Sequence, residues 1–221
     1  MRKVQISVGE YYHLYNRGMQ KQPIFSNDSD RARLLFLLLY LQSTTTVSNV
    51  GYHAQHFIKH SVFDKVSMRL YEDILNNRQV ELVAFCFMPN HFHLVVYEKV
   101  AGGIARYMQR VQNGYTKYFN TKYKKAGHLF QGPYQAVHVA DDRQLLHLSA
   151  YLHRNPKELA GWEKREHEYP WSSYQDYIKS NRWNDLLKTD VVLGQFKTIR
   201  EYSEFVDTSP AKDNIYQTLG V

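Results

Sequence analysis

The chain has 221 residues, a net charge of +7 and 43% hydrophobic residues, which suits one domain or one domain with an extension. This composition supplies enough apolar side chains for a core and excludes wholesale disorder. The longest apolar run, Leu34–Leu41, is too short to span a bilayer, and the single cysteine, Cys86, excludes an internal disulfide framework and a multi-cysteine zinc site.

The first third of the chain predicts one strand and two helices. Tyr11–Tyr15 is rich in aromatic residues and is followed by turn-forming residues, which is typical of a strand. Asp28–Gln42 predicts a helix with an acidic cap and an apolar body. Ser43–His60 is rich in Ser, Thr and His and predicts a loop or lid, whereas Val66–Asn77 predicts a second helix.

A β-hairpin is predicted in the middle of the chain. Val80–Met88 is a nearly continuous apolar run, which suits a strand that is buried on both faces. Pro89 and Asn90 then form a tight turn, and His91–Tyr97 returns as the second strand.

Two helices and one strand are predicted after the hairpin. Gly102–Asn120 carries apolar residues at spacings of three and four, which indicates a helix with one buried face. Gln135–Val139 predicts a short strand, and Asp141–Asn155 predicts a capped helix that stops at Pro156.

This order of elements predicts an α+β fold. We expect a ferredoxin-like (RRM-like) antiparallel sheet with helices packed on one face, plus a C-terminal extension. The principal domain would cover residues 1–160, with a loop insertion at about 43–65, and the extension would cover 161–221 and pack on the same domain.

The positive charge is concentrated in one segment. From Lys99 to Ala140 there are seven basic and no acidic residues, whereas the rest of the chain is neutral overall. Such a segment indicates a polyanion partner, with a solvated charged face as the alternative. The predicted nucleic-acid contacts are Arg106, Arg110, Lys117, Lys122, Lys124, Lys125 and His128. The stretch from Lys122 to His128 is the strongest candidate, because it is loop-like and densely charged.

Two histidines open the second strand of the predicted hairpin. Because side chains alternate along a strand, His91 and His93 point to one face and Phe92 to the other. Two imidazoles on one face can share a metal ion, although two partly exposed sheet histidines would give the same pattern. Their position at the start of an apolar strand favours a functional role.

Tyr151 and Asn155 form a second pair of candidate residues. They lie four residues apart on the predicted helix and therefore share a face. A tyrosine at such a position is often only a half-buried core residue, so the pair alone is a weak signal.

Together the two pairs suggest phosphodiester chemistry. Two imidazoles and an amide are neutral ligands, so a bound Mg²⁺ or Mn²⁺ ion would keep its charge to polarise a phosphate. A tyrosine phenol has a pKa of roughly 10 and needs a nearby cation or base before it can attack. Attack by Tyr151 would leave a phosphotyrosine, which a strand's 3′-hydroxyl could later reverse. Tyr115 is a competing nucleophile in a basic helix, but it lacks an amide four residues later and lies on the apolar face.

At these residues the chain resembles the single-tyrosine transposases of the HUH superfamily, and most closely the branch of REP-associated tyrosine transposases. The segment CFMPNHFHLVV resembles the histidine hairpin of that family, and YLHRNP resembles its tyrosine motif, some 60 residues later. The segments YYHLYNRG, GHLFQG and YPWSSY are also similar, so the likeness runs from about Tyr11 to Tyr177.

The resemblance implies a ferredoxin-like fold and a DNA strand transferase. Members of this family cut single-stranded DNA near hairpins with a divalent metal ion, form a covalent 5′-phosphotyrosine and leave a free 3′-hydroxyl. By position, His91 and His93 match the metal ligands, Tyr151 matches the nucleophile, and Asn155 matches the polar residue that helps to hold the metal. One departure is Pro133, where this branch has a basic residue, and another is the sequence NPKELAG after the tyrosine motif. Neither departure touches the four matched positions.

Two alternatives remain open at this stage. The chain could be a non-catalytic module that binds structured DNA or RNA, or a related nuclease that works in replication or conjugation. The resemblance allows a monomer or a homodimer. No apolar segment with a cleavage site follows Met1, so we expect a cytoplasmic protein without membrane association that is nucleoid-associated when bound to DNA.

Overall fold

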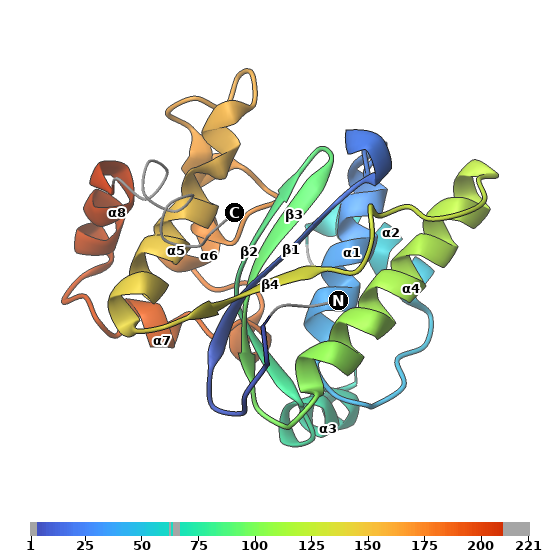
Figure 1. Ribbon diagram of the computed structural model, residues 1–221. Coiled ribbons are helices and arrows are strands. Elements are labelled where there is room, and N and C mark those ends of the chain that lie inside the picture. Colours follow the sequence, from blue (N-terminus) through green and yellow to red (C-terminus); the bar gives the residue numbers. More distant parts are fainter. Residues whose placement is uncertain (1–3, 62, 64–66, 210–221) are drawn as a thin grey trace.

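A computed structural model describes residues 4–61, 63 and 67–209 (Figure 1). Its centre is a four-stranded antiparallel sheet in the order β2-β3-β1-β4. The strands are β1 (Tyr11–Arg17), β2 (Val80–Met88), β3 (His91–Glu98) and β4 (Gln135–Val139). The order confirms the ferredoxin-like sheet, because β2 and β3 form the predicted hairpin and β1 lies between β3 and β4.

Eight α-helices surround the sheet in the described residues. They are α1 (Asp28–Tyr40), α2 (Val50–His60), α3 (Met68–Asn76), α4 (Gly103–Tyr123), α5 (Asp142–Arg154), α6 (Tyr174–Ile178), α7 (Asp190–Leu193) and α8 (Ile199–Thr208). Short 3₁₀ turns occupy Met19–Lys21, Asn155–Glu158, Glu166–Glu168 and Asn184–Leu186. No helix in the described ranges is long and apolar enough to cross a membrane.

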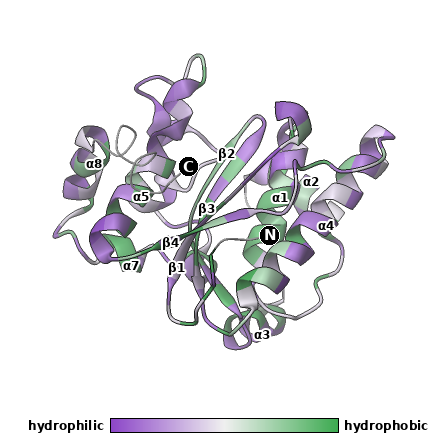
Figure 2. Ribbon diagram, in the orientation of Figure 1, coloured by the Kyte–Doolittle hydropathy of each residue, from purple (hydrophilic) through white to green (hydrophobic). Residues whose placement is uncertain are grey.

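Helices α1 and α4 cover one face of the sheet (Figure 1). The start of α1 is fixed by a capping box, in which Asn27 accepts from the backbone of Asp30 and Asp30 accepts from the backbone of Asn27. The start of α4 is fixed by the buried carboxylate of Glu98, which accepts from the backbone N–H groups of Gly103 and Ile104. Figure 2 shows that α1 is largely hydrophobic, whereas α4 mixes hydrophobic and hydrophilic residues, as expected of a helix with one face on the core.

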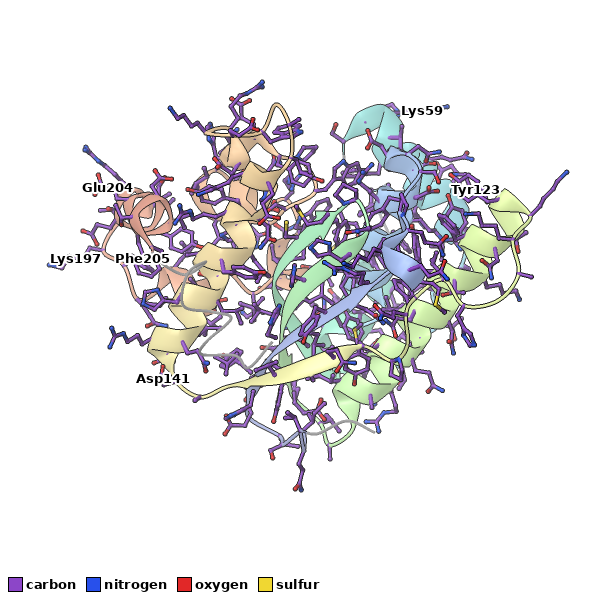
Figure 3. The ribbon with its side chains drawn as sticks, turned by 45° about the horizontal axis from the view of Figure 1, so that its top comes forward. Lys59, Tyr123, Asp141, Lys197, Glu204 and Phe205 are labelled. Carbon is purple, nitrogen blue, oxygen red and sulfur yellow. The ribbon has the colours of Figure 1, made fainter. Side chains whose placement is uncertain are left out.

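Helix α5 and the segments that follow it cover the opposite face. In Figure 3, Asp141 at the start of α5 and Phe205 on α8 lie on the side of the sheet away from α4. Leu145, Leu148 and Leu152 of α5 are buried in the core on this face. The structure thus adds a second layer of helices to those expected on one face.

The segment after α5 also closes the outer edge of the sheet. Ser173 and Lys188 donate backbone N–H groups to carbonyls of β2, and the N–H of Phe87 on β2 donates to the carbonyl of Trp171. These bonds satisfy polar groups that an edge strand would otherwise leave open. The segment between Trp171 and Lys188 is therefore attached to the edge of the sheet, whereas α8 packs against α5 and α6.

The prediction of a loop over Ser43–His60 is wrong for its second half, which forms α2. Ala54 and Phe57 are buried three residues apart, and α2 packs against α1. The ring of Phe57 lies 5.9 Å from Trp171 and 5.8 Å from Trp183, so distant aromatic residues stabilise this helix. The second predicted helix begins at Met68, and Val66 lies outside the described residues.

Candidate active site

All four residues of the two predicted pairs line one cavity of about 650 Å³. The cavity lies on the α5 side of the sheet, where β3 begins and β1 ends. His91 and His93 come from β3, and Tyr151 and Asn155 come from α5 and its end. The fold thus brings together residues that are about 60 positions apart in the sequence.

The two histidines lie side by side on β3. Their ring centroids are 5.0 Å apart with perpendicular planes, and Phe92 between them points into the opposite core. Nδ1 of His91 lies 2.6 Å from the amide oxygen of Asn90. Because an amide oxygen only accepts, Nδ1 of His91 carries the proton and Nε2 keeps a lone pair for a ligand.

The tyrosine lies edge-on against these imidazoles. The ring of Tyr151 is 5.4 Å from the ring of His93 at an angle of 80°, and the residue is 7% exposed. The side-chain amide of Asn155 donates to the carbonyl of Tyr151 at 2.8 Å, one helical turn earlier. This bond uses the amide nitrogen of Asn155 and leaves its oxygen as a potential ligand.

Burial keeps the histidines of the cavity uncharged at neutral pH. It lowers the pKa of His91 to about 4, and the guanidinium of Arg17 adds to the effect. The pKa of His93 is well below its ordinary value, again mainly because of burial and then because of His13 and His91. Uncharged imidazoles are the form that binds metal ions.

The donors of the cavity fit a divalent metal ion. His91, His93 and Asn155 offer two imidazoles and one amide oxygen, a neutral set that Mn²⁺ or Mg²⁺ can use together with phosphate oxygens and water. The held Nδ1 proton of His91 is also typical of a histidine that binds metal through its other nitrogen. In the described part of the chain, no group of three or more His, Cys, Asp and Glu side chains is arranged as a metal site.

Strand β1 contributes residues that were not predicted from the sequence. His13, Tyr15 and Arg17 all line the cavity, because alternate residues of β1 share the face of His93. In the register of the sheet, Tyr15 lies opposite His93 and Arg17 lies opposite His91. The alternation within YYHLYNR was visible in the sequence, but its partner strand was not.

Two side chains of opposite charge complete the cavity wall. Arg17 is exposed and forms no ion pair within the described ranges, so its guanidinium is available to an anion. Glu158 follows Asn155 by three residues. Its carboxylate raises the pKa of His91, whereas Arg17 lowers it. Pro133, which stands where a basic residue was expected, also lines the cavity.

Three of the seven predicted DNA contacts are engaged within the protein. Arg110 donates to the backbone carbonyls of Ser43 and Thr45, and Arg106 donates to Gln79 and Ala101. Lys122 binds the buried carboxylate of Asp30 at 2.6 Å. Burial alone would raise the pKa of Asp30, but hydrogen bonds from Lys122 and neighbouring groups outweigh burial and lower it.

The other four predicted contacts are exposed. Lys117, Lys124, Lys125 and His128 lie along the second half of α4 and the loop that follows. Tyr123, at the end of α4, marks this tip in Figure 3. Whether these side chains bind DNA stays a prediction, and the geometry favours the tip over the first half of α4.

The competing nucleophile lies outside the cavity. Tyr115 is fully buried on the α1 side of the sheet, and its hydroxyl donates to the carbonyl of Ile24 at 2.6 Å. Burial raises the pKa of this phenol well above its ordinary value. Both facts favour Tyr151.

Comparisons with known proteins identify a family and a similar fold. Residues 40–155, just over half of the chain, match the family model described as "Transposase IS200 like". A solved structure described as a REP-associated tyrosine transposase bound to a REP hairpin has a similar fold, with a TM-score of 0.52 and 13% identity over 80% of this chain and 84% of that one. A search of curated proteins finds no match.

Proposed function

Because the chain belongs to the family of IS200-like transposases, we propose that it cleaves and rejoins single-stranded, hairpin-bearing DNA through a covalent bond to Tyr151. The observation that carries the proposal is the contact between the rings of Tyr151 and His93 in a cavity that also holds His91 and Asn155. This arrangement supports the proposed roles of Tyr151 as the nucleophile and of the neighbouring uncharged side chains as metal ligands.

Tyr151 carries out the proposed cleavage and rejoining. The phenol of Tyr151 loses its proton to solvent and its oxygen attacks the scissile phosphorus, so a P–O bond to Tyr151 forms and the P–O3′ bond breaks. The 3′ oxygen takes up a proton from solvent as it leaves. The released strand leaves with a protonated 3′-hydroxyl, and the 5′-phosphate stays on Tyr151. Attack by a 3′-hydroxyl on this phosphotyrosine reverses the step and rejoins a strand.

The cavity orients the substrate for this attack. His91, His93 and Asn155 would hold a divalent metal ion, which polarises the phosphate and stabilises the charge that develops on it. Arg17 lies opposite His91 on the neighbouring strand β1, and its guanidinium can donate two parallel N–H bonds to two oxygens of one phosphate. The amide of Asn155, bonded to the backbone of Tyr151, links the position of the nucleophile to that of the ligand.

Hairpin DNA is the proposed substrate for two reasons. The structure with a similar fold is described as bound to a REP hairpin, and the tip of α4 carries exposed basic side chains. Basic side chains bind phosphates irrespective of base sequence, so the tip suits the stem of a hairpin while the cavity receives an unpaired strand.

The test is a search for the covalent product. The protein is incubated with single-stranded hairpin DNA and Mn²⁺ and then denatured, and a slower band that contains both protein and DNA is expected on a gel. Tyr151→Phe should remove this band and leave hairpin binding intact. Tyr97→Phe is the matched control, because Tyr97 lies on the same face of β3 but does not line the cavity.

The opposite result would reject the proposal. An undiminished adduct with Tyr151→Phe would exclude Tyr151 as the nucleophile. No adduct from the unmodified chain, together with equal binding of RNA and DNA hairpins, would favour a non-catalytic binding module.

A further inference from the structure

His13 on β1 makes a direct contact with the candidate ligand His93. Nε2 of His13 lies 2.8 Å from Nδ1 of His93, and the two rings stack with centroids 5.0 Å apart and planes at 21°. Both side chains are buried, at 2% and 7% exposure. The contact crosses from β1 to β3, so the pairing of these strands fixes it.

Only one proton lies between these two nitrogens. If Nε2 of His13 donates, Nδ1 of His93 accepts, and the proton of the uncharged His93 ring is on Nε2. If Nδ1 of His93 donates instead, Nε2 of His93 keeps its lone pair and can bind a ligand. The direction of this one hydrogen bond therefore decides whether His93 can bind a metal ion through Nε2.

The other ring nitrogen of His13, Nδ1, is buried and forms no hydrogen bond within the described residues. Leaving a buried polar atom unpaired costs free energy, and such atoms in native structures concentrate where function requires them. An apolar side chain would fill this position on β1 without that cost.

The neighbouring histidine gives an internal comparison. Nδ1 of His91 donates to the side chain of Asn90, which leaves Nε2 of His91 free. His13 is placed to do for His93 what Asn90 does for His91. Both candidate ligands then have an acceptor for the Nδ1 proton, one from the turn before β3 and one from β1.

We propose that His13 is a positioning residue whose Nε2 accepts a hydrogen bond from Nδ1–H of His93, so that Nε2 of His93 keeps its lone pair for the metal ion. The inference rests on the proposed metal site of His91, His93 and Asn155. Partners of this kind are worth about 10- to 100-fold in metal affinity. His13 lies outside residues 40–155, which match the family model.

A pair of variants of equal length separates the hydrogen bond from packing. In His13→Gln the amide oxygen can accept at the position of Nε2, whereas His13→Met fills similar space with no comparable acceptor. Mn²⁺ affinity is measured from the signal of the free ion in electron paramagnetic resonance, with hairpin DNA bound and in a Tyr151→Phe background. We expect about 10- to 100-fold weaker binding for His13→Met and near-normal binding for His13→Gln.

Two further variants identify the source of a failure. His91→Ala tests the metal site itself, and if it leaves Mn²⁺ affinity unchanged, or if the starting protein binds no Mn²⁺, the proposed site and the role of His13 are both rejected. His138→Phe is the matched control, because His138 lies on β4 outside the cavity and bonds Glu10. If His91→Ala loses the metal while His13→Met keeps full affinity, only the role of His13 is overturned.

A measurement on the protein with His13 intact tests the proposal even if His13→Met does not fold. Nitrogen NMR of labelled histidines in the Mg²⁺-loaded complex should place the proton of His93 on Nδ1. A proton on Nε2 of His93 in that complex would contradict the proposal.

Discussion

Strand β3 presents two very different faces to the layers on either side of it. Phe92, Leu94 and Val96 point toward α1 and α4 and are at most 1% exposed in an apolar core. The alternate residues point toward α5, where Val95 continues the second core but His91 and His93 line the cavity. One strand therefore contributes to a uniform core on one face and to a polar site on the other.

The difference shows which face of the strand carries groups that lower the stability of the fold. On the α1 face of β3, the side chains of Phe92, Leu94 and Val96 are all apolar and buried. The α5 face buries imidazoles whose pKa values are lowered and leaves Nδ1 of His13 without a partner in the described chain. Departures of this kind are expected at functional sites and must be offset elsewhere in the fold. We therefore expect substitutions on the two faces of β3 to affect different properties.

The largest effect is expected for His91→Ala on the cavity face. Loss of a metal ligand should lower the rate of metal-dependent cleavage at least about 100-fold, because a bound metal ion contributes several kcal/mol to such a transition state. The free energy of unfolding should change by less than about 1 kcal/mol, since His91 is only partly buried. Cleavage assays and urea titrations measure the two quantities, and normal cleavage would contradict the assignment of His91.

The converse is expected for Leu94→Ala on the core face. Removing this fully buried side chain should reduce the free energy of unfolding by about 2–5 kcal/mol, through lost burial and a cavity. The fraction that stays folded should bind Mn²⁺ normally. A loss of metal affinity in folded Leu94→Ala protein would show that the two faces are not independent.

The free energy of unfolding should fall at acidic pH because of the buried histidines on the α5 face. Burial lowers the pKa of His153, which bonds Ser173 and Tyr202, to about 3. In the unfolded chain His153 takes up a proton near the ordinary pKa of about 6.5. The contribution of uncharged His153 to the free energy of unfolding is therefore complete above that pH and declines as the pH falls toward 3. The slope for one such group is at most about 1.4 kcal/mol per pH unit.

Unfolding of His153→Gln and of the unmodified chain, measured between pH 7 and pH 4, tests this expectation. His153→Gln should show a shallower decline. His60→Gln, at an exposed position on α2, is the control and should follow the unmodified chain. Equal slopes for His153→Gln and the unmodified chain would reject the contribution of His153.

The smallest effect is expected at the tip of α4. Replacing both Lys124 and Lys125 by Ala should weaken hairpin binding at physiological salt, and each lost phosphate contact should reduce the salt-dependence slope by roughly 0.7–0.9. Lys122→Ala should instead lower stability, because Lys122 pairs with the buried Asp30. Unchanged salt dependence in the double variant would place the DNA elsewhere.

Local sequence patterns were sufficient to predict most of the fold. The continuous apolar run of β2, the alternation along β3 and the helical period of α4 and α5 are each contained within one element, so the elements and the shared face of His91 and His93 followed from the sequence alone. The helix α2 did not, because its few apolar residues are stabilised by Trp171 and Trp183, more than a hundred residues away.

The cavity was predictable only in part for the same reason. Tyr151 and Asn155 could be paired because they lie one helical turn apart, but His13 and Arg17 join the site through the register of β1 against β3. That register depends on contacts about 80 residues apart in the sequence. Charge was also an incomplete guide, since it does not show that Lys122 and Arg110 are held by internal partners.

The most direct test of the assignment is mass spectrometry of the covalent product formed with hairpin DNA and Mn²⁺. After digestion of protein and DNA, we expect a nucleotide attached through its 5′-phosphate to the peptide that contains Tyr151, and a free 3′-hydroxyl on the released strand. A nucleotide on Tyr115, Tyr15 or any other residue, or a 3′-phosphate on the released strand, would contradict this mechanism.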